Sequence, residues 1–87
     1  MIVKLNKNQF DYLNYSLSEE HEKLRLKLKK VSQEYRFFIL EIDETTADEI
    51  HDWASDELQR KGFDINYELT SEGKLLEELI DLFYIGQ

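Results

Sequence analysis

The chain has 87 residues, no cysteine, 41% apolar residues and a formal net charge of −8. This length predicts a single domain, residues 1–87, whose small core excludes a deep substrate cavity. The missing cysteines exclude disulfides and thiolate metal sites, and the apolar share excludes a disordered acidic chain.

The N-terminal residues predict a strand followed by a helix. Residues 1–5 are mostly apolar and suit a strand, and Asn6 or Asn8 can cap the helix after it. In that helix Phe10, Leu13 and Leu17 share one face. Residues 18–22 are polar and acidic, and we expect a loop or a frayed helix end there.

The middle of the chain predicts a hairpin. In residues 23–29 leucines alternate strictly with lysine or arginine, which is typical of a half-buried strand. Residues 32–34 supply a polar turn. Residues 35–43 are continuously apolar at their centre, so we expect the central strand there, paired with the lysine-rich one.

A long amphipathic helix is predicted over residues 46–61. Thr46 and Glu49 have the spacing of a capping box, and an apolar stripe follows along the helix. The stripe consists of Ala47, Ile50, Ala54 and Leu58. Gly62 is expected to end the helix in the left-handed conformation, with Leu58 contacting Phe63 as in a Schellman motif.

A last helix is predicted after a connector over residues 64–70. It begins at Thr70 or Ser71, and Gly86 is expected to end it. Its buried face is expected to consist of Leu75, Leu76, Leu79, Ile80 and Phe83. The predicted order is therefore β-α-β-β-α-α, an α+β domain in which helices cover a three-stranded sheet with a lysine-rich hairpin.

The sequence argues against catalysis, and we predict that the protein is not an enzyme. His21 and His51 have no recognisable catalytic partners, and three glycines are too few for a phosphate-binding loop. Residues 19–22 combine glutamates with His21, but adjacent side chains do not converge on a metal ion. We therefore expect no cofactor and no metal.

The charges are distributed unevenly. Residues 23–36 carry six lysines or arginines against one glutamate, whereas residues 37–87 carry fourteen carboxylates against three cations. Strong negative charge disfavours direct binding to nucleic acid and favours a basic protein partner. We expect a cytoplasmic monomer or weak homo-oligomer without a membrane partner, because residues 1–5 are too short for a signal peptide and no apolar run spans a bilayer.

Carboxylates form a stripe opposite the apolar face of helix 46–61. Like charges four residues apart destabilise a helix, so the stripe indicates either a binding surface or simply a solvated face. Trp53 lies at its border, where it is either an interface anchor or part of the core. The candidate partner-binding residues are Asp43, Glu44, Asp48, Glu49, Asp52, Trp53 and Asp56. The acidic face of the last helix is the alternative surface.

The cations of residues 23–29 allow two interpretations. Lys23, Arg25, Lys27 and Lys29 on one strand face suit phosphates or an acidic partner. They also suit an exposed sheet edge, where charge prevents aggregation.

The C-terminal half carries a resemblance. In residues 41–44, Trp53, Gly62-Phe63 and residues 73–81 the chain resembles small immunity proteins of bacterial toxin systems. The resemblance implies a cytoplasmic inhibitor that docks on a cognate toxin, commonly a basic nuclease. Two alternatives stay open: an anti-defence protein of a phage or mobile element that mimics nucleic acid, and a small self-associating subunit.

Overall fold

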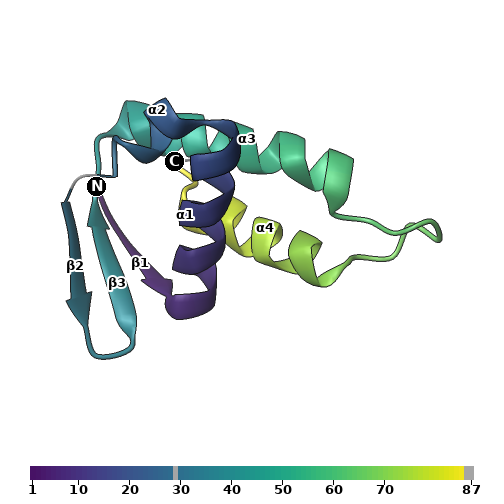
Figure 1. The fold of residues 1–87 in the computed structure, drawn as a ribbon, viewed down its shortest axis with the longest axis horizontal. Coiled ribbons are helices and arrows are strands. Elements are labelled where there is room, and N and C mark those ends of the chain that lie inside the picture. Colours follow the sequence, from purple (N-terminus) through teal and green to yellow (C-terminus); the bar gives the residue numbers. More distant parts are fainter. Residues whose placement is uncertain (29, 86–87) are drawn as a thin grey trace.

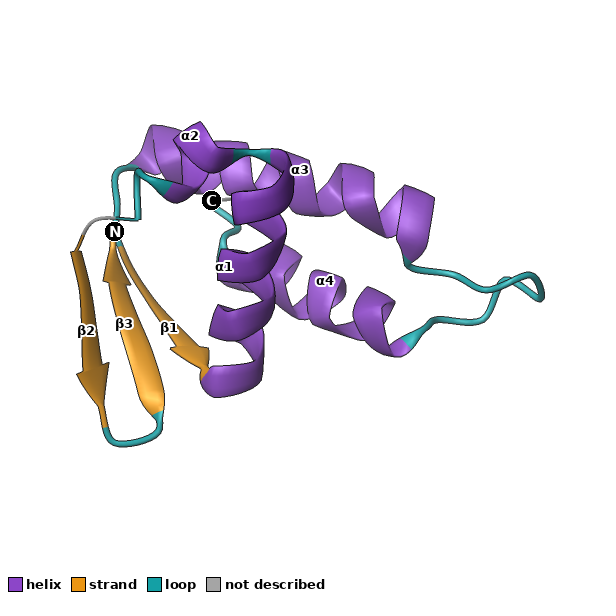
Figure 2. Ribbon diagram, viewed as in Figure 1, coloured by secondary structure: helices purple, strands orange, loops and turns teal. Residues whose placement is uncertain are grey.

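The computed structural model describes residues 1–28 and 30–85, except for the side chains of residues 30 and 31. It is a small α+β domain in the predicted order β-α-β-β-α-α, with one additional single-turn helix, α2 (Figures 1 and 2). The elements are β1 (Ile2–Asn6), α1 (Lys7–Glu20), α2 (Glu22–Arg25), β2 (Lys30–Glu34), β3 (Phe37–Glu41), α3 (Glu44–Lys61) and α4 (Ser71–Leu82).

The sheet is antiparallel with the order β1-β3-β2, so the apolar strand β3 is central, as predicted. Val3 of β1 pairs with Leu40 of β3, and both side chains are buried against the helices. Lys4 faces the other side, where its ammonium lies 4.4 Å from the centre of the Phe37 ring. The strands therefore alternate between a core face and an open face.

The strand predicted for residues 23–29 is wrong over residues 23–28, and Lys29 lies outside the described residues. The chain there forms α2 and a following turn, in which the amide of Leu26 donates to the carbonyl of Glu22 and that of Leu28 to Arg25. Leucine and lysine are good helix formers, and here only Leu24 is buried, while Leu26 is 54% exposed. The lysine-rich segment is therefore not part of the hairpin.

The turn predicted at residues 32–34 is also wrong. These polar residues belong to β2, which is an edge strand, and their side chains stay exposed to solvent there. The hairpin turns at Tyr35 and Arg36, and Tyr35 has a left-handed backbone with φ of 57°.

In Figure 1 helix α1 lies between the sheet on one side and helices α3 and α4 on the other. It begins at Asn6, whose side chain accepts from the amide of Gln9 at 2.8 Å. Phe10 stacks on Phe38 of β3, with ring centres 4.3 Å apart. As predicted, Leu13 and Leu17 are fully buried on the same face. Residues 18–20 still belong to α1 and α2 begins at Glu22, so the loop or frayed end expected at residues 18–22 is reduced to a break at His21.

Tyr12 of α1 reaches α4, where its hydroxyl donates to Glu72 Oε2 at 2.6 Å. Burial raises the pKa of the Tyr12 hydroxyl, and the Glu72 carboxylate raises it further. The folded state thus holds a proton that the unfolded chain releases near pH 10, so this contribution to stability is present below about pH 10 and is lost above it.

We expect the free energy of unfolding to fall less between pH 9 and pH 11 in Tyr12→Phe than in the wild type. Urea unfolding at both pH values, followed by tryptophan fluorescence, measures this difference. Equal losses in the two proteins would show that the Tyr12 proton does not contribute.

Helix α3 begins earlier than predicted. Its N-cap is Asp43, whose Oδ1 accepts from the amide of Thr46 at 2.7 Å, so the capping box at Thr46 and Glu49 is wrong. Asp43 caps the helix in place of Thr46 because aspartate is a favoured N-cap residue, and the helix then begins at Glu44. Thr46 is buried within the first turn of α3. The predicted stripe is confirmed: Ala47, Ile50 and Ala54 are fully buried, and Leu58 is half-buried.

Gly62 ends α3, but not in the left-handed conformation, since its φ is −78°. The Schellman motif is therefore wrong. Instead the amide of Thr70 donates to the carbonyl of Gly62 at 2.8 Å, and Gly73 lies directly against the Gly62 backbone. Thr70 caps α4 as predicted, through its hydroxyl and the amide of Gly73.

Helix α4 buries Leu76, Leu79 and Phe83 completely, while Leu75 and Ile80 are half-buried. The helix ends at Leu82, before the predicted stop at Gly86, which itself lies outside the described residues. In the part of the chain that is described, no helix has the length and apolar character that crossing a bilayer requires.

Candidate functional site

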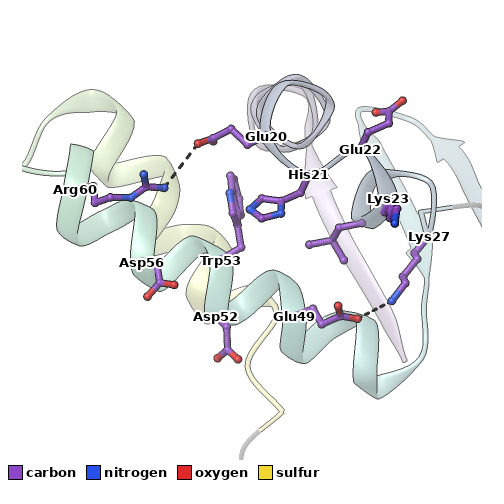
Figure 3. A pocket seen from close by; sticks show the side chains of 11 residues that line it. Glu20, His21, Glu22, Lys23, Lys27, Glu49, Asp52, Trp53, Asp56 and Arg60 are labelled. Carbon is purple, nitrogen blue, oxygen red and sulfur yellow. Dashed lines mark hydrogen bonds and ion pairs between the residues drawn. The ribbon is translucent and has the colours of Figure 1, made fainter.

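A cleft of about 700 Å³ lies between the end of α1 with α2 on one side and α3 on the other (Figure 3). Its walls carry five carboxylates, three cations and one histidine. The lining residues are Glu20, His21, Glu22, Lys23, Leu24, Lys27, Glu49, Asp52, Trp53, Asp56 and Arg60. The charged composition makes the cleft suited to polar groups of a partner rather than to an apolar ligand.

Ion pairs connect the two walls. Lys27 Nζ lies 2.8 Å from Glu49 Oε1 at one end, and Arg60 lies 3.7 Å from Glu20 at the other. Glu22 is instead paired within α2 with Arg25, whose guanidinium lowers the pKa of the Glu22 carboxyl. The cations of this region are therefore largely engaged with carboxylates of the same molecule.

Trp53 extends from α3 toward the end of α1, where it lies beside His21 (Figure 3). The sequence left open whether this side chain is core or an exposed anchor, and the structure places it in the core with 5% exposure. Its indole Nε1 is buried and has no hydrogen-bond partner among the described residues. A buried donor without an acceptor costs about 1–3 kcal/mol, and a partner's oxygen can remove that cost if the cleft opens.

The predicted acidic stripe is exposed along α3. Asp48, Asp52 and Asp56 are all solvent-accessible, and Figure 3 shows the carboxylates of Asp52 and Asp56 on the outer side of the helix, away from Trp53. Among the described side chains Asp48 and Asp56 make no ion pair, and the nearest basic group to Asp52 is His51 Nδ1 at 3.9 Å. In the described part of the chain, no lysine or arginine is therefore paired with these three carboxylates.

The remaining predicted site residues have different surroundings. Glu49 is paired with Lys27, and Glu44 is exposed and lines neither cleft. Asp43 is the N-cap of α3, and the hydrogen bond from the Thr46 amide lowers the pKa of its carboxyl. Asp43 also lines a second cleft of about 550 Å³, which meets the first at Lys27.

The wall opposite α3 was not predicted from the sequence. Glu20, His21 and Lys27 were assigned to a loop and a strand, whereas the end of α1, α2 and the following turn place them at the cleft. The run of charged residues over 19–22 was a signal for this wall, but its partner helix could not be identified without the fold.

Glu57 of α3 was also missed. Its side chain is fully buried, and its carboxylate forms no hydrogen bond but pairs with Arg60 and, at 2.9 Å, with Lys61 Nζ. The two cations also lie 3.7 Å from Glu20. The spacing of three and four residues between Glu57 and these cations was visible in the sequence.

The described residues contain no group of three or more histidine, cysteine or acidic side chains that converges as a metal site. Among the described residues, His21, His51 and the carboxylates of the cleft also form no hydrogen-bonded nucleophile–base pair.

Comparison with protein-family models, curated proteins and solved structures finds no match to this chain. The resemblance to immunity proteins stays a prediction. A function can therefore be inferred only from the geometry and charge of the surface of α3.

Proposed function

We propose that this protein binds a basic protein through the exposed carboxylates of α3 and thereby inhibits it. The observation that carries the proposal is the row formed by Asp48, Asp52 and Asp56, which no described cation neutralises. Other carboxylates near α3 differ, since Glu20, Glu49 and Glu57 all have basic neighbours.

The row destabilises the free protein. Each like-charged pair four residues apart costs a helix about 0.2–0.5 kcal/mol, and a single lysine in place of Asp52, the middle carboxylate, would turn both repulsive pairs into attractive ones. Lysines or arginines of a partner remove it as well, and they turn the repulsion within α3 into attraction across the interface. The net charge of −8 also accelerates the encounter with a basic surface.

The specific form of the proposal is an immunity protein that neutralises a bacterial toxin. A nuclease toxin carries basic side chains in the groove that holds the phosphates of its substrate. An acidic helix docked on that groove competes with the nucleic acid for the same cations, so inhibition needs no catalytic group in the inhibitor.

Affinity capture from a lysate of the source cells tests this proposal. We expect the tagged protein to retain one basic toxin-like protein at low salt and much less of it at high salt. Recovery of a restriction or other defence enzyme would support the nucleic-acid mimic instead. Recovery of only the protein itself would contradict binding to a basic partner and support the self-associating subunit.

A further inference from the structure

The connection between α3 and α4 exposes apolar side chains at alternating positions. We call residues 63–69 the finger; in Figure 1 it projects at the end of the molecule opposite the sheet. The exposed fractions are 45% for Phe63, 93% for Ile65, 88% for Tyr67 and 40% for Leu69. A cluster of large apolar side chains on such a projection marks a binding surface more often than a requirement of the fold.

The finger is held in one shape by hydrogen bonds. Asp64 Oδ1 accepts from the amides of Asn66 and Glu68 at 2.8 and 3.0 Å, and the Asp64 amide donates to the Glu68 carbonyl at 2.9 Å. At its base Phe63 and Leu69 form an isolated antiparallel bridge. A preformed loop loses little conformational entropy when it binds, so its apolar side chains are presented ready for contact.

Tyr67 has an unfavourable backbone for its residue type. Its φ is 61°, a left-handed conformation in which glycine or asparagine is favoured over a bulky aromatic residue. The side chain is not compensated by packing, because it is almost fully exposed. A tyrosine at this position costs stability and supplies nothing to the core, which indicates that its ring is used outside the fold.

We propose that the finger inserts Ile65 and Tyr67 into an apolar pocket of another protein, with basic side chains around the pocket. The basic border follows from charge: residues 63–69 contain Asp64 and Glu68 and no lysine or arginine. An anionic membrane would repel this segment.

A second copy of this chain does not fit the finger. Both copies carry a net charge of −8, so the acidic finger of one copy would be repelled by the other copy. A different protein of complementary charge is therefore the occupant. The inference does not depend on the α3 carboxylates, since the finger uses other residues.

Site-specific photo-crosslinking in the source cells tests the proposal with the full chain. Benzoylphenylalanine is placed at Ile65 or Tyr67, with Tyr15 of α1 as the control because it is 67% exposed and far from the finger in sequence. We expect the same partner protein to be crosslinked from both finger positions but not from position 15. The crosslinks should form at apolar residues of that partner. Links only to lipid, only to another copy of the chain, or equally from all three positions would overturn the proposal.

The linked protein is then purified and titrated with finger variants. Ile65→Ser and Tyr67→Asn are expected to weaken binding at least about tenfold, as loss of an interface anchor does, whereas Tyr15→Ser stays within about twofold. Tyr67→Asn should unfold at the same urea concentration as the wild type or a higher one, because asparagine tolerates the left-handed backbone. Binding by both finger variants within twofold of the wild type would contradict the inference.

The two proposals fail separately in this titration. Asp52→Lys with Asp56→Lys tests the α3 carboxylates in the same assay. Loss of binding in the finger variants alone would leave the finger proposal standing and refute the α3 surface, and the reverse pattern would refute the finger.

Discussion

Gly73→Ala is expected to lower the free energy of unfolding by about 2–3 kcal/mol, the range found for overpacked interiors. Gly73 lies in the first turn of α4 against the backbone of Gly62, and a methyl group there would collide with main-chain atoms. A flexible side chain could rotate away, but the Gly62 backbone is fixed by the hydrogen bond from Thr70. The ends of α3 and α4 must therefore move apart.

Urea unfolding followed by tryptophan fluorescence measures this loss, and Ser71→Ala is the matched control. Ser71 is exposed in the same helical turn, so its substitution should change stability by less than about 0.5 kcal/mol. A Gly73→Ala protein as stable as the control would contradict the close approach of the two helices.

Removal of both cations beside Glu57 is the second large expected effect. In Arg60→Ala with Lys61→Ala the fully buried Glu57 carboxylate loses its partners, and we expect a loss of about 2–3 kcal/mol. This value is below the full cost of breaking a buried pair, because Arg60 is 62% exposed and water can reach the vacated space.

A third substitution separates the cost of the unpaired Glu57 charge from the loss of the two cations themselves. Adding Glu57→Met to the double variant removes the unpaired charge while keeping the volume, so most of the lost stability should return. If the triple variant is no more stable than the double one, the burial of the Glu57 charge is not the cause. Equal unfolding midpoints of the double variant and the wild type would contradict the ion pairs.

The fold class and the three longer helices were predictable because their signals are local. Leu13 and Leu17 of α1, the stripe of α3 and the buried face of α4 have helical spacing, and α1 and α4 also have capping residues that the sequence indicates, Asn6 and Thr70. The alternation of residues 23–29 was misleading because it also fits a helical turn whose apolar side chains are buried to different extents: Leu24 is buried, Leu28 is half-buried and Leu26 is exposed.

That error also concealed the candidate site. With residues 23–29 in a strand, Lys27 could not be placed against Glu49, so the cleft between α2 and α3 had only its α3 wall. The exposed carboxylates of α3 were predictable from helical spacing, whereas the burial of Trp53 and Glu57 depends on α1, α2 and α4 packing around them.

The shape of the finger was not predictable either. Residues 64–70 were predicted as an extended connector, whereas Asp64 accepts hydrogen bonds from the amides of Asn66 and Glu68, and Tyr67 has a left-handed backbone. The composition of the segment does not indicate these features.

The most direct measurement of the central claim is a titration of the captured basic partner with matched charge-reversal variants. Asp52→Lys with Asp56→Lys reverses two carboxylates of α3, and Glu77→Lys with Asp81→Lys reverses two carboxylates with the same spacing on α4, the alternative surface. Both variants change the net charge equally, so a difference between them reports the location of the interface.

We predict that the α3 variant binds at least about a hundredfold more weakly than the wild type, because like charges across an interface cost several kcal/mol. The α4 variant should bind within about threefold, since charges outside an interface act only at long range and are screened by salt. Equal binding by both variants, or loss of binding only in the α4 variant, would contradict the assignment of α3 as the binding surface.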